Sequence, residues 1–481
     1  MTGQASSTNM LTNKQRSTIL LTIMTGAFIT VLAQTVLTSA LPSIMSDFNV
    51  SANTGQWLTT IYMLVLGVMI PATPYLINRF STRTLFISSM VFFVVGCGLS
   101  IIAKSFSVMV ISRILQAICG GINTQLVQIL IMRMYPIEER GSAMGMYGFV
   151  VGVAPTVGPI AAGLIIDSLG WRALFYILGV ITLLDIVLAY IFLQNVGQTK
   201  EDKLDILSLT LSTIGFGGLL IGISNKGSYG WSNVLTYAPL LIGIISLIVF
   251  TIRQLNVDEP LLNIRTFKSK AFAVSVILIL IVYAAMTSSS TMFSLYMQSI
   301  RGYSALSTGL LMLPGSILMA IFSPVSGKLF DKYGPTKVII PGFVFLLLGT
   351  VSYSFLGENT SLIYLAVMYS LRMIGIAFLL MTVTTWGINS LDSKDISSGS
   401  AISSTLRQVS GSIGSAILMT IMSSVSLKNV SSMSSKLADI KGMNVSFLVA
   451  SVLVLIGLTL AIVFIRNNES KEDKELSEKL A

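Results

Sequence analysis

The chain has no histidine and little charge: only 10% of its 481 residues are Asp, Glu, Lys or Arg. A soluble globular protein carries roughly 25% charged residues, so water is not the main solvent of this chain. Without histidine, sites and proton relays that depend on imidazole are excluded. Cys97 and Cys119, the two cysteines, both fall inside apolar runs. The sequence therefore predicts neither a disulfide framework nor a cysteine metal cluster, and no metal site is expected.

Other absences narrow the function. Residues 1–14 are polar and lack the apolar core of a cleavable signal peptide. No soluble domain longer than about 50 residues and no phosphate-cradling glycine loop is found, which argues against an enzyme or a sensor. The net charge of +10 does not require nucleic acid, because lysine and arginine collect in the cytoplasmic loops of membrane proteins.

Hydrophobic residues make up 53% of the chain, and most of them lie in long apolar runs. Runs of about 18 residues or more can cross a hydrocarbon core of about 30 Å as helices. Lipid leaves only helices or closed barrels, and unbroken runs select helices. The predicted fold class is an all-α integral membrane protein with fourteen spans: residues 18–42, 54–77, 84–103, 106–132, 141–166, 172–194, 206–224, 236–254, 271–297, 304–330, 338–357, 361–388, 398–424 and 445–465.

The polar segments between the spans suggest an organisation. Most Lys and Arg residues lie in loops on the same side as both termini, so the termini are predicted to be cytoplasmic. Two longer polar segments, at 195–205 and 253–270, divide the spans into six, two and six. We therefore predict five parts: a cytoplasmic N-terminal tail (1–17), a six-helix bundle (18–194), linker segments with two additional helices (195–270), a second six-helix bundle (271–465) and a cytoplasmic C-terminal tail (466–481).

The two predicted bundles echo one another. Residues 74–83 (PYLINRFSTR), after the second span, have a counterpart in residues 327–337 (GKLFDKYGPTK), after the tenth. Arg113 in the fourth span likewise has a counterpart in Arg372 in the twelfth. Internal repeats of this kind are typical of transporters that move two bundles around a midplane site, and they argue against a pore.

Several stretches along the chain carry a family resemblance. They are SRILQAICGG from 112, GVAPTVGPIAAG from 152, GWRALFYI from 170, SIRGYSALSTGLLMLPG from 299, GKLFDKYGPTK from 327 and TLRQVSGSIG from 405. They resemble the major facilitator superfamily, specifically its fourteen-span drug–proton antiporter branch of the QacA/EmrB type, over nearly the whole chain. The resemblance implies a major-facilitator fold of two six-helix bundles plus two extra helices. The first loop departs from the family pattern, because Pro74, Asn78 and Ser81 replace a Gly, an Asp and a Gly.

The 152–163 stretch matches the antiporter signature of the fifth span, except that Ala162 replaces a glycine. Small residues on one helix face allow close helix approach, and each proline removes a backbone hydrogen bond and bends the helix. We predict a gate here, although ordinary small-residue packing would leave the same pattern. The predicted gate residues are Gly148, Gly152, Pro155, Gly158, Pro159 and Gly163.

The loop at 327–337 joins two helices on the cytoplasmic side. Asp331 can meet the positive N-terminus of a neighbouring helix or an arginine, and Gly334 permits a tight turn. Family resemblance implies a state-dependent contact, whereas the alternative is a solvated turn. The predicted latch residues of the two loops are Asn78, Arg79, Arg83, Gly327, Asp331, Lys332 and Gly334.

Ionisable groups inside spans are costly and mark function by default. Arg113 and Gln116 match the fourth-span signature, whose arginine the resemblance implicates in proton coupling. Arg372 holds the repeat-related place, and Arg407 matches the thirteenth-span pattern. Structural pairing with carbonyls or amides is the alternative for all three arginines.

Proton coupling needs a group that can hold a proton near neutral pH, and only a carboxyl group is available. Relatives carry an aspartate in the first span, where this chain has Ala33 followed by Gln34. Asp185 is the only acid deep within a span, about twelve residues into the sixth. We therefore predict Asp185 as the coupling residue; the alternative is that it pairs with a nearby polar group.

An adaptable apolar pocket would suit an amphiphilic substrate, and Met side chains re-pack around different shapes. The candidate wall residues are Gln34, Tyr62, Met63, Tyr147, Met292 and Tyr296. Because buried arginines outnumber buried acids, neutral, zwitterionic or anionic substrates should be preferred to dications.

The sequence thus predicts a drug or antibiotic exporter of the bacterial cytoplasmic membrane that exchanges substrate for protons. No catalytic residue and no cofactor is expected; the only partners are amphiphilic substrates and membrane lipid, and the chain should act as a monomer. A lipid or glycolipid flippase on the same fold is the alternative. Substrate accumulation and lipid distribution in a deletion strain would distinguish the two.

Overall fold

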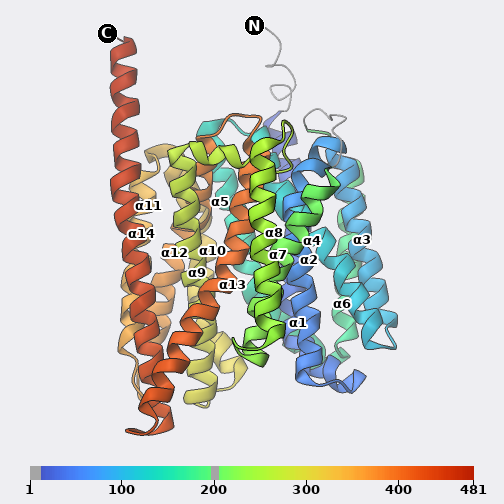
Figure 1. Cartoon of the computed structure of the whole chain (residues 1–481). Coiled ribbons are helices and arrows are strands. Elements are labelled where there is room, and N and C mark those ends of the chain that lie inside the picture. The colour runs from blue at the N-terminus through green and yellow to red at the C-terminus, as the bar shows by residue number, and fades with distance from the viewer. Residues whose placement is uncertain (1–11, 197–204, 481) are drawn as a thin grey trace. The chain divides into compact units, whose positions relative to one another are not determined.

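The computed structural model describes residues 12–196 and 205–480 (Figure 1). It contains 14 helices long and apolar enough to cross a membrane, as the hydropathy pattern predicted. Their bounds are α1 Asn13–Phe48, α2 Ala52–Arg79, α3 Thr82–Ile102, α4 Phe106–Met134, α5 Arg140–Leu169, α6 Arg172–Phe192, α7 Ile206–Tyr229, α8 Val234–Asn256, α9 Lys270–Leu295, α10 Ala305–Tyr333, α11 Thr336–Ser352, α12 Leu362–Asn389, α13 Ile396–Asn429 and α14 Ser435–Leu480.

Most helices run past the predicted spans, because polar side chains continue the helix beyond the apolar run. α1 begins at Asn13 rather than at 18, since Thr12 and Gln15 form a capping box. α14 begins at Ser435, ten residues before the predicted 445, and its polar first turns are tied to α13 by the Asp439 carboxylate, which accepts a hydrogen bond from Ser426. The linker prediction at 195–205 falls largely on residues 197–204, outside the described residues.

Contacts divide the chain into two compact units that do not follow chain order strictly. The first unit comprises residues 1–136, 154–265 and 393–405, and the second comprises 137–153, 266–392 and 406–481. Residues 1–11 and 197–204 of the first unit and residue 481 of the second are not described. The predicted bundle boundaries at 194 and 270 stay predictions.

Within the first unit, α4 packs against α1, α2 and α3, and α6 packs against α1 and α3. Within the second unit, α12 packs in the same way against α9, α10 and α11, while α14 packs against α9 and α11. The sequence echo is therefore a repeat of helix packing, in which α4 and α12 hold the most central positions.

The two additional helices, α7 and α8, form a hairpin in the first unit and lie side by side (Figure 1). Gly218 and Gly243 face each other across the hairpin, where a Cβ on either would collide with the backbone of the other helix. The hairpin is attached through α7 to α2, where the side chain of Leu220 approaches Gly67. The extra spans thus belong to the first unit by contact.

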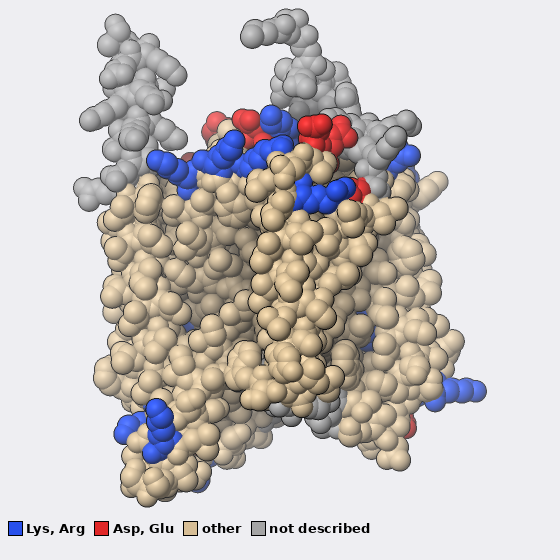
Figure 2. Space-filling view, viewed as in Figure 1, with Lys and Arg blue, Asp and Glu red and all other residues tan. Residues whose placement is uncertain are grey.

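Charged side chains lie mainly at the helix ends, and Figure 2 shows an uncharged belt along the middles of the visible helices. Exposed large apolar side chains recur on that belt, for example Leu241, Ile245, Ile248 and Ile252 along α8. Their spacing of three or four residues makes one continuous apolar helix face, as lipid contact requires.

Candidate functional site

Arg113 is the centre of a buried polar cluster in the first unit. Its side chain is fully buried on α4, and its guanidinium lies over the Tyr62 ring, 4.3 Å from the ring centroid. Its Nη1 donates to Gln116 Oε1 at 2.5 Å and lies 3.5 Å from the carbonyl oxygen of Ala33 on α1. Gln116 in turn donates through Nε2 to Ser112 Oγ at 3.1 Å. The family-matching pair, Arg113 and Gln116, is therefore in direct contact.

Arg372 occupies the repeat-related place in the second unit and is also fully buried. Its Nε donates to Thr350 Oγ1 at 3.2 Å, and its Nη2 donates to the carbonyl oxygen of Ala285 on α9 at 2.9 Å. Gly349 makes room for it, because a Cβ there would collide with the arginine side chain. Each central helix thus directs one arginine at a carbonyl of the first helix of its own repeat.

The two arginines differ in how fully their donors are used. The Nε and Nη2 atoms of Arg113 are buried without a hydrogen-bond acceptor, whereas in Arg372 only Nη1 is. Neither arginine pairs with a carboxylate among the described residues, where the ion pairs found are Arg172–Asp47 and Arg253–Asp205.

Asp185 lies on the buried face of α6, in a stripe with Leu178, Thr182 and Ala189 that faces the interior of the first unit. It is 1% exposed, and neither carboxylate oxygen has a hydrogen-bond donor among the described residues. Pairing with a nearby polar group, the structural alternative, is not observed.

Asp331, near the end of α10, caps the N-terminus of α5 within the second unit. Its two carboxylate oxygens accept from the backbone amides of Gly141, at 2.7 Å, and Ser142, at 2.6 Å. These are first-turn amides that the helix itself leaves without acceptors. Gly327 lets the helices meet, because a Cβ there would strike the Gly141 backbone.

The remaining residues of this loop have simpler roles. Gly334 ends α10 with φ +80°, a conformation that favours glycine, and its amide donates to the Phe330 carbonyl at 2.9 Å. Lys332 is exposed, with its Nζ 5.1 Å from the Tyr333 ring centroid. The structure thus places Asp331 at the helix terminus that the sequence suggested, while its role as a latch stays a prediction.

The degenerate first loop makes its contacts through arginines and an amide, without a carboxylate. Asn78 accepts from Arg133 Nη2 at 3.1 Å, and the same nitrogen donates to Ser397 at the start of α13, at 3.0 Å. Arg83 bonds to the carbonyl of Tyr190 and stacks on its ring, whereas Arg79 is exposed. The repeat-related contact at α13 therefore exists without the aspartate.

The gate motif lies where α5 passes from one compact unit to the other. The boundary falls between Val153 and Ala154, directly before Pro155. Gly148 and Gly152 precede it and lie against Ser323 and Met319 of α10.

Beyond the boundary, Gly158 lies against Thr35 of α1. Pro155 and Pro159 are exposed, and Gly163 has open space beside it. One helix thus packs its two halves on different partners, with a proline at the change.

The predicted cavity residues are mostly enclosed by packing. Tyr62, Tyr147, Met292 and Tyr296 are buried; the Tyr62 hydroxyl donates to the Thr30 carbonyl at 3.0 Å. Gln34 and Met63 are half-buried and touch each other, with Gln34 Nε2 3.2 Å from Met63 Sδ. Their role as substrate walls stays a prediction.

Sequence reasoning missed a polar groove on α9. It has a volume of about 410 Å³ and lies on the helix face opposite Met292 and Tyr296. The run TSSSTMFS from 287 was the available signal, because hydroxyl groups three or four residues apart share one helix face. The groove is lined by Ser290, Thr291, Ser294, Leu295, Gln298 and Ser299.

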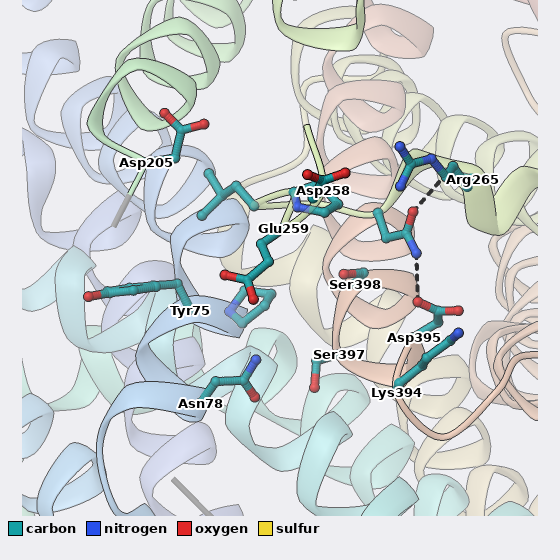
Figure 3. Close-up of a pocket in the computed structure, with 14 residues that line it drawn as sticks. Tyr75, Asn78, Asp205, Asp258, Glu259, Arg265, Lys394, Asp395, Ser397 and Ser398 are labelled. Carbon is teal, nitrogen blue, oxygen red and sulfur yellow. Dashed lines mark hydrogen bonds between the residues drawn. The ribbon is translucent and has the colours of Figure 1, made fainter. Parts of the chain in front are cut away.

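A second pocket, of about 340 Å³, lies in the first unit between the end of α2, the segment after α8 and the start of α13 (Figure 3). Glu259 extends into it, and Asn78 is the predicted site residue among its lining. At its edge Asn263 donates to Asp395 at 2.7 Å. The pocket carries both signs of charge and so gives no simple electrostatic preference.

Asp205, which also lines this pocket, forms a bidentate ion pair with Arg253, at 3.1 Å from both Nε and Nη2. Burial raises the pKa of Asp205, but hydrogen bonds from Arg253 and Ser208 outweigh it and bring the pKa to about 2. The stabilisation is therefore present above the ordinary value of 3.8 and is lost as pH falls toward 2.

We expect Asp205→Asn and Arg253→Gln each to lower stability by about 1 kcal/mol at neutral pH, with a coupling energy of similar size. A double-mutant cycle of thermal unfolding in detergent measures it. The coupling should fade between about pH 4 and pH 2, and a coupling that is unchanged at the acid end would contradict the assignment.

Arg407 lies in the second unit with its guanidinium 5.4 Å from the Tyr283 ring centroid, and its side chain is 9% exposed. Among the described residues no group of three or more His, Cys, Asp or Glu side chains could hold a metal ion.

Comparisons with known proteins agree with this arrangement. A family model described as Major Facilitator Superfamily matches residues 23–415. The uncharacterized MFS-type transporter YcnB of Bacillus subtilis is 41% identical over 446 residues, covering 93% of this chain and 94% of that protein. The lincomycin resistance protein LmrB of the same organism is 37% identical over 406 residues, covering 84% of this chain and 85% of that protein.

A solved structure of the proton:xylose symporter XylE shares the fold, with a TM-score of 0.64 at 15% identity, covering 95% of this chain and 97% of that one. The extent of the family match and the identity to its members leave one assignment. The chain is a multi-pass membrane transporter, not an enzyme, and it belongs to the major facilitator superfamily.

Proposed function

We propose that this transporter exports amphiphilic drugs or antibiotics by alternating access, in exchange for protons. It would do so in the bacterial cytoplasmic membrane, with both termini in the cytoplasm. The relatives named for lincomycin resistance support this direction and this class of substrate. A relative named multidrug transporter MdtP, 26% identical over 411 residues, points the same way.

The observation that carries the proposal is the division of α5 at Pro155. Alternating access needs elements that can exchange packing partners between two stable arrangements. The first half of α5 is held by α10 through glycine contacts and the Asp331 carboxylate. A helix that is interrupted by proline and clamped through hydrogen bonds can release one half while the other stays packed.

The proton would be carried by Asp185. Asp185 is buried, and neither of its carboxylate oxygens has a hydrogen-bond donor among the described residues, which is the environment in which an acid inside a span marks function. Arg113 and Gln116 would set the electrostatic potential around Asp185. Their cluster lies on α4 and Asp185 lies on α6, and both helices pack against α1.

Drug uptake into everted membrane vesicles tests the proposal. With the vesicle interior acidified, a lincosamide should accumulate, and a protonophore should abolish the accumulation. Vesicles without the protein give the background. Gradient-independent uptake would contradict proton exchange, and no uptake of any amphiphilic antibiotic would contradict drug export.

The same vesicles compare substrate charge. We expect a neutral lincosamide or phenicol to be taken up at least about tenfold better than a bis-cationic drug, because each unit buries a guanidinium group that has no carboxylate partner among the described residues. Better uptake of the dication would overturn this preference.

A further inference from the structure

The donors of Arg113 that lack an acceptor lie together. Nε and Nη2 form one side of the guanidinium plane, and this side presents two parallel N–H groups, the geometry that binds a carboxylate through both oxygens. The opposite nitrogen, Nη1, is already engaged by Gln116 and approaches the Ala33 carbonyl. One planar face is covered by Tyr62. The two donors without an acceptor are therefore the adjacent pair that suits a carboxylate, rather than donors scattered around the group.

Leaving this side empty is costly. A guanidinium stays protonated in proteins, and a buried charged donor without an acceptor carries its full desolvation cost. Arg113 is 0% exposed, and no carboxylate pairs with it among the described residues. An arginine that is retained under these conditions is explained if a bound anion completes it in part of the transport cycle.

Arg372 supplies an internal comparison. Its Nε and Nη2, the same two atoms, are filled by Thr350 Oγ1 and the Ala285 carbonyl. Both arginines sit at equivalent places of the repeat, yet only the first unit leaves the carboxylate-binding side open. Close by, Gln34 Nε2 spends a hydrogen bond on the thioether of Met63, which is a weak acceptor.

We propose that Arg113 is a binding site for the carboxylate group of a monoanionic ligand, held through Nε and Nη2, with the Tyr62 ring over the guanidinium plane. The carboxylate can belong to a transported amphiphile or to a small free carboxylic acid. The inference does not rest on drug export, because it concerns binding at one side chain.

Benzoate and acetate are suitable probes, with benzamide as the uncharged match of benzoate. The full chain is purified in lipid nanodiscs at constant ionic strength, and its unfolding temperature is followed as each probe is titrated. Benzoate should raise the unfolding temperature in a saturable manner and benzamide should not. Equal effects of benzoate and acetate indicate a small free acid as the source, and a benzoate affinity at least about tenfold higher indicates an amphiphile, since 1.4 kcal/mol of apolar contact gives that factor.

Two variants remove the site differently. Arg113→Gln takes away the cation, and Ala33→Asp places a carboxylate within the protein beside it; either should weaken the benzoate response at least about tenfold. Arg407→Gln, which removes an arginine from the second unit, should keep the response. Ala33→Asp guards against misfolding of the first variant, because it is expected to stabilise the fold.

The proposal is overturned if benzoate and benzamide act alike on the wild type, or if Ala33→Asp responds to benzoate as the wild type does. Neither result bears on whether vesicles accumulate drug. Conversely, absent drug uptake together with intact benzoate binding would remove the proposed export and leave this site standing.

Discussion

Replacing Asp331 by Asn is expected to reduce gradient-driven uptake at least about tenfold, a factor that corresponds to 1.4 kcal/mol. The carboxylate now accepts from two first-turn amides of α5, and hydrogen bonds to a charged group contribute about 1.5–3 kcal/mol each. An asparagine can offer only one acceptor oxygen, and its NH₂ group would face a second N–H donor. The arrangement in which α10 holds the start of α5 should therefore lose most of its stability relative to the arrangement in which the contact is released.

Hydrogen exchange gives a readout of this contact that does not depend on transport. The amides of Gly141 and Ser142 should exchange at least about tenfold faster in the variant, because their acceptor is lost. Asp392→Asn, which changes an exposed aspartate before α13, is the matched control and should alter neither exchange nor uptake. Unchanged protection at the start of α5 in Asp331→Asn would show that the carboxylate does not hold the helix.

The first loop indicates why the effect should be larger at Asp331 than at its counterpart, Asn78. Asn78 stands where the second loop has Asp331, and Arg133 links it to the start of α13. Arg133 supplies the charge in that contact, whereas Asn78 offers one neutral acceptor oxygen, so replacing Asn78 removes one hydrogen bond rather than two. The carboxylate contact at α5 should therefore be the more sensitive of the two to substitution.

Apolar run length was enough to predict the fourteen helices, because a bilayer demands both helical backbone and a minimum span. It could not predict helix ends. Thr12 and Gln15 extend α1, and the first turns of α14 are held by Ser426, and these are polar contacts that a hydropathy window discards.

The candidate site was likewise predicted from the sequence only in part. Chemistry alone left two partners for Asp331, a helix N-terminus or an arginine, and the structure shows the helix N-terminus. Which helix it caps depends on tertiary packing, here the approach of Gly327 to Gly141. The sequence likewise indicated an arginine in α4 and, in the first span, Ala33 where relatives carry an aspartate. Only the structure shows which of its atoms are unfilled.

Residue type did not indicate which face of α9 is exposed. Met292 and Tyr296, whose role as substrate walls stays a prediction, are buried, while hydroxyl groups on the other face line a groove. In a membrane helix both faces can be apolar, so amphipathic periodicity does not identify the packed side. Polar residues are the better guide there, because lipid does not accept them.

The last prediction concerns Asp185. Asp185→Asn should abolish the response of uptake to the pH gradient and lower accumulation to the level that vesicles reach without a gradient, because an amide cannot gain or lose a proton. Equilibrium exchange of drug across the membrane should persist, since it needs no net proton movement. Asp167→Asn, at the exposed end of α5, is the control and should leave the gradient response intact.

Thermal stability decides between a coupling role and a structural one. A carboxylate that held the helices together would have hydrogen-bond donors, and its loss would destabilise the chain by several kcal/mol. Asp185 has no donor among the described residues, so an uncharged amide of the same shape should leave the unfolding temperature equal or higher. A variant that is stable, exchanges drug and ignores the gradient would identify Asp185 as the proton carrier. Gradient-driven uptake equal to that of the wild type would remove it from the mechanism, and would leave a carboxylate at the substrate or outside the spans as the remaining carrier.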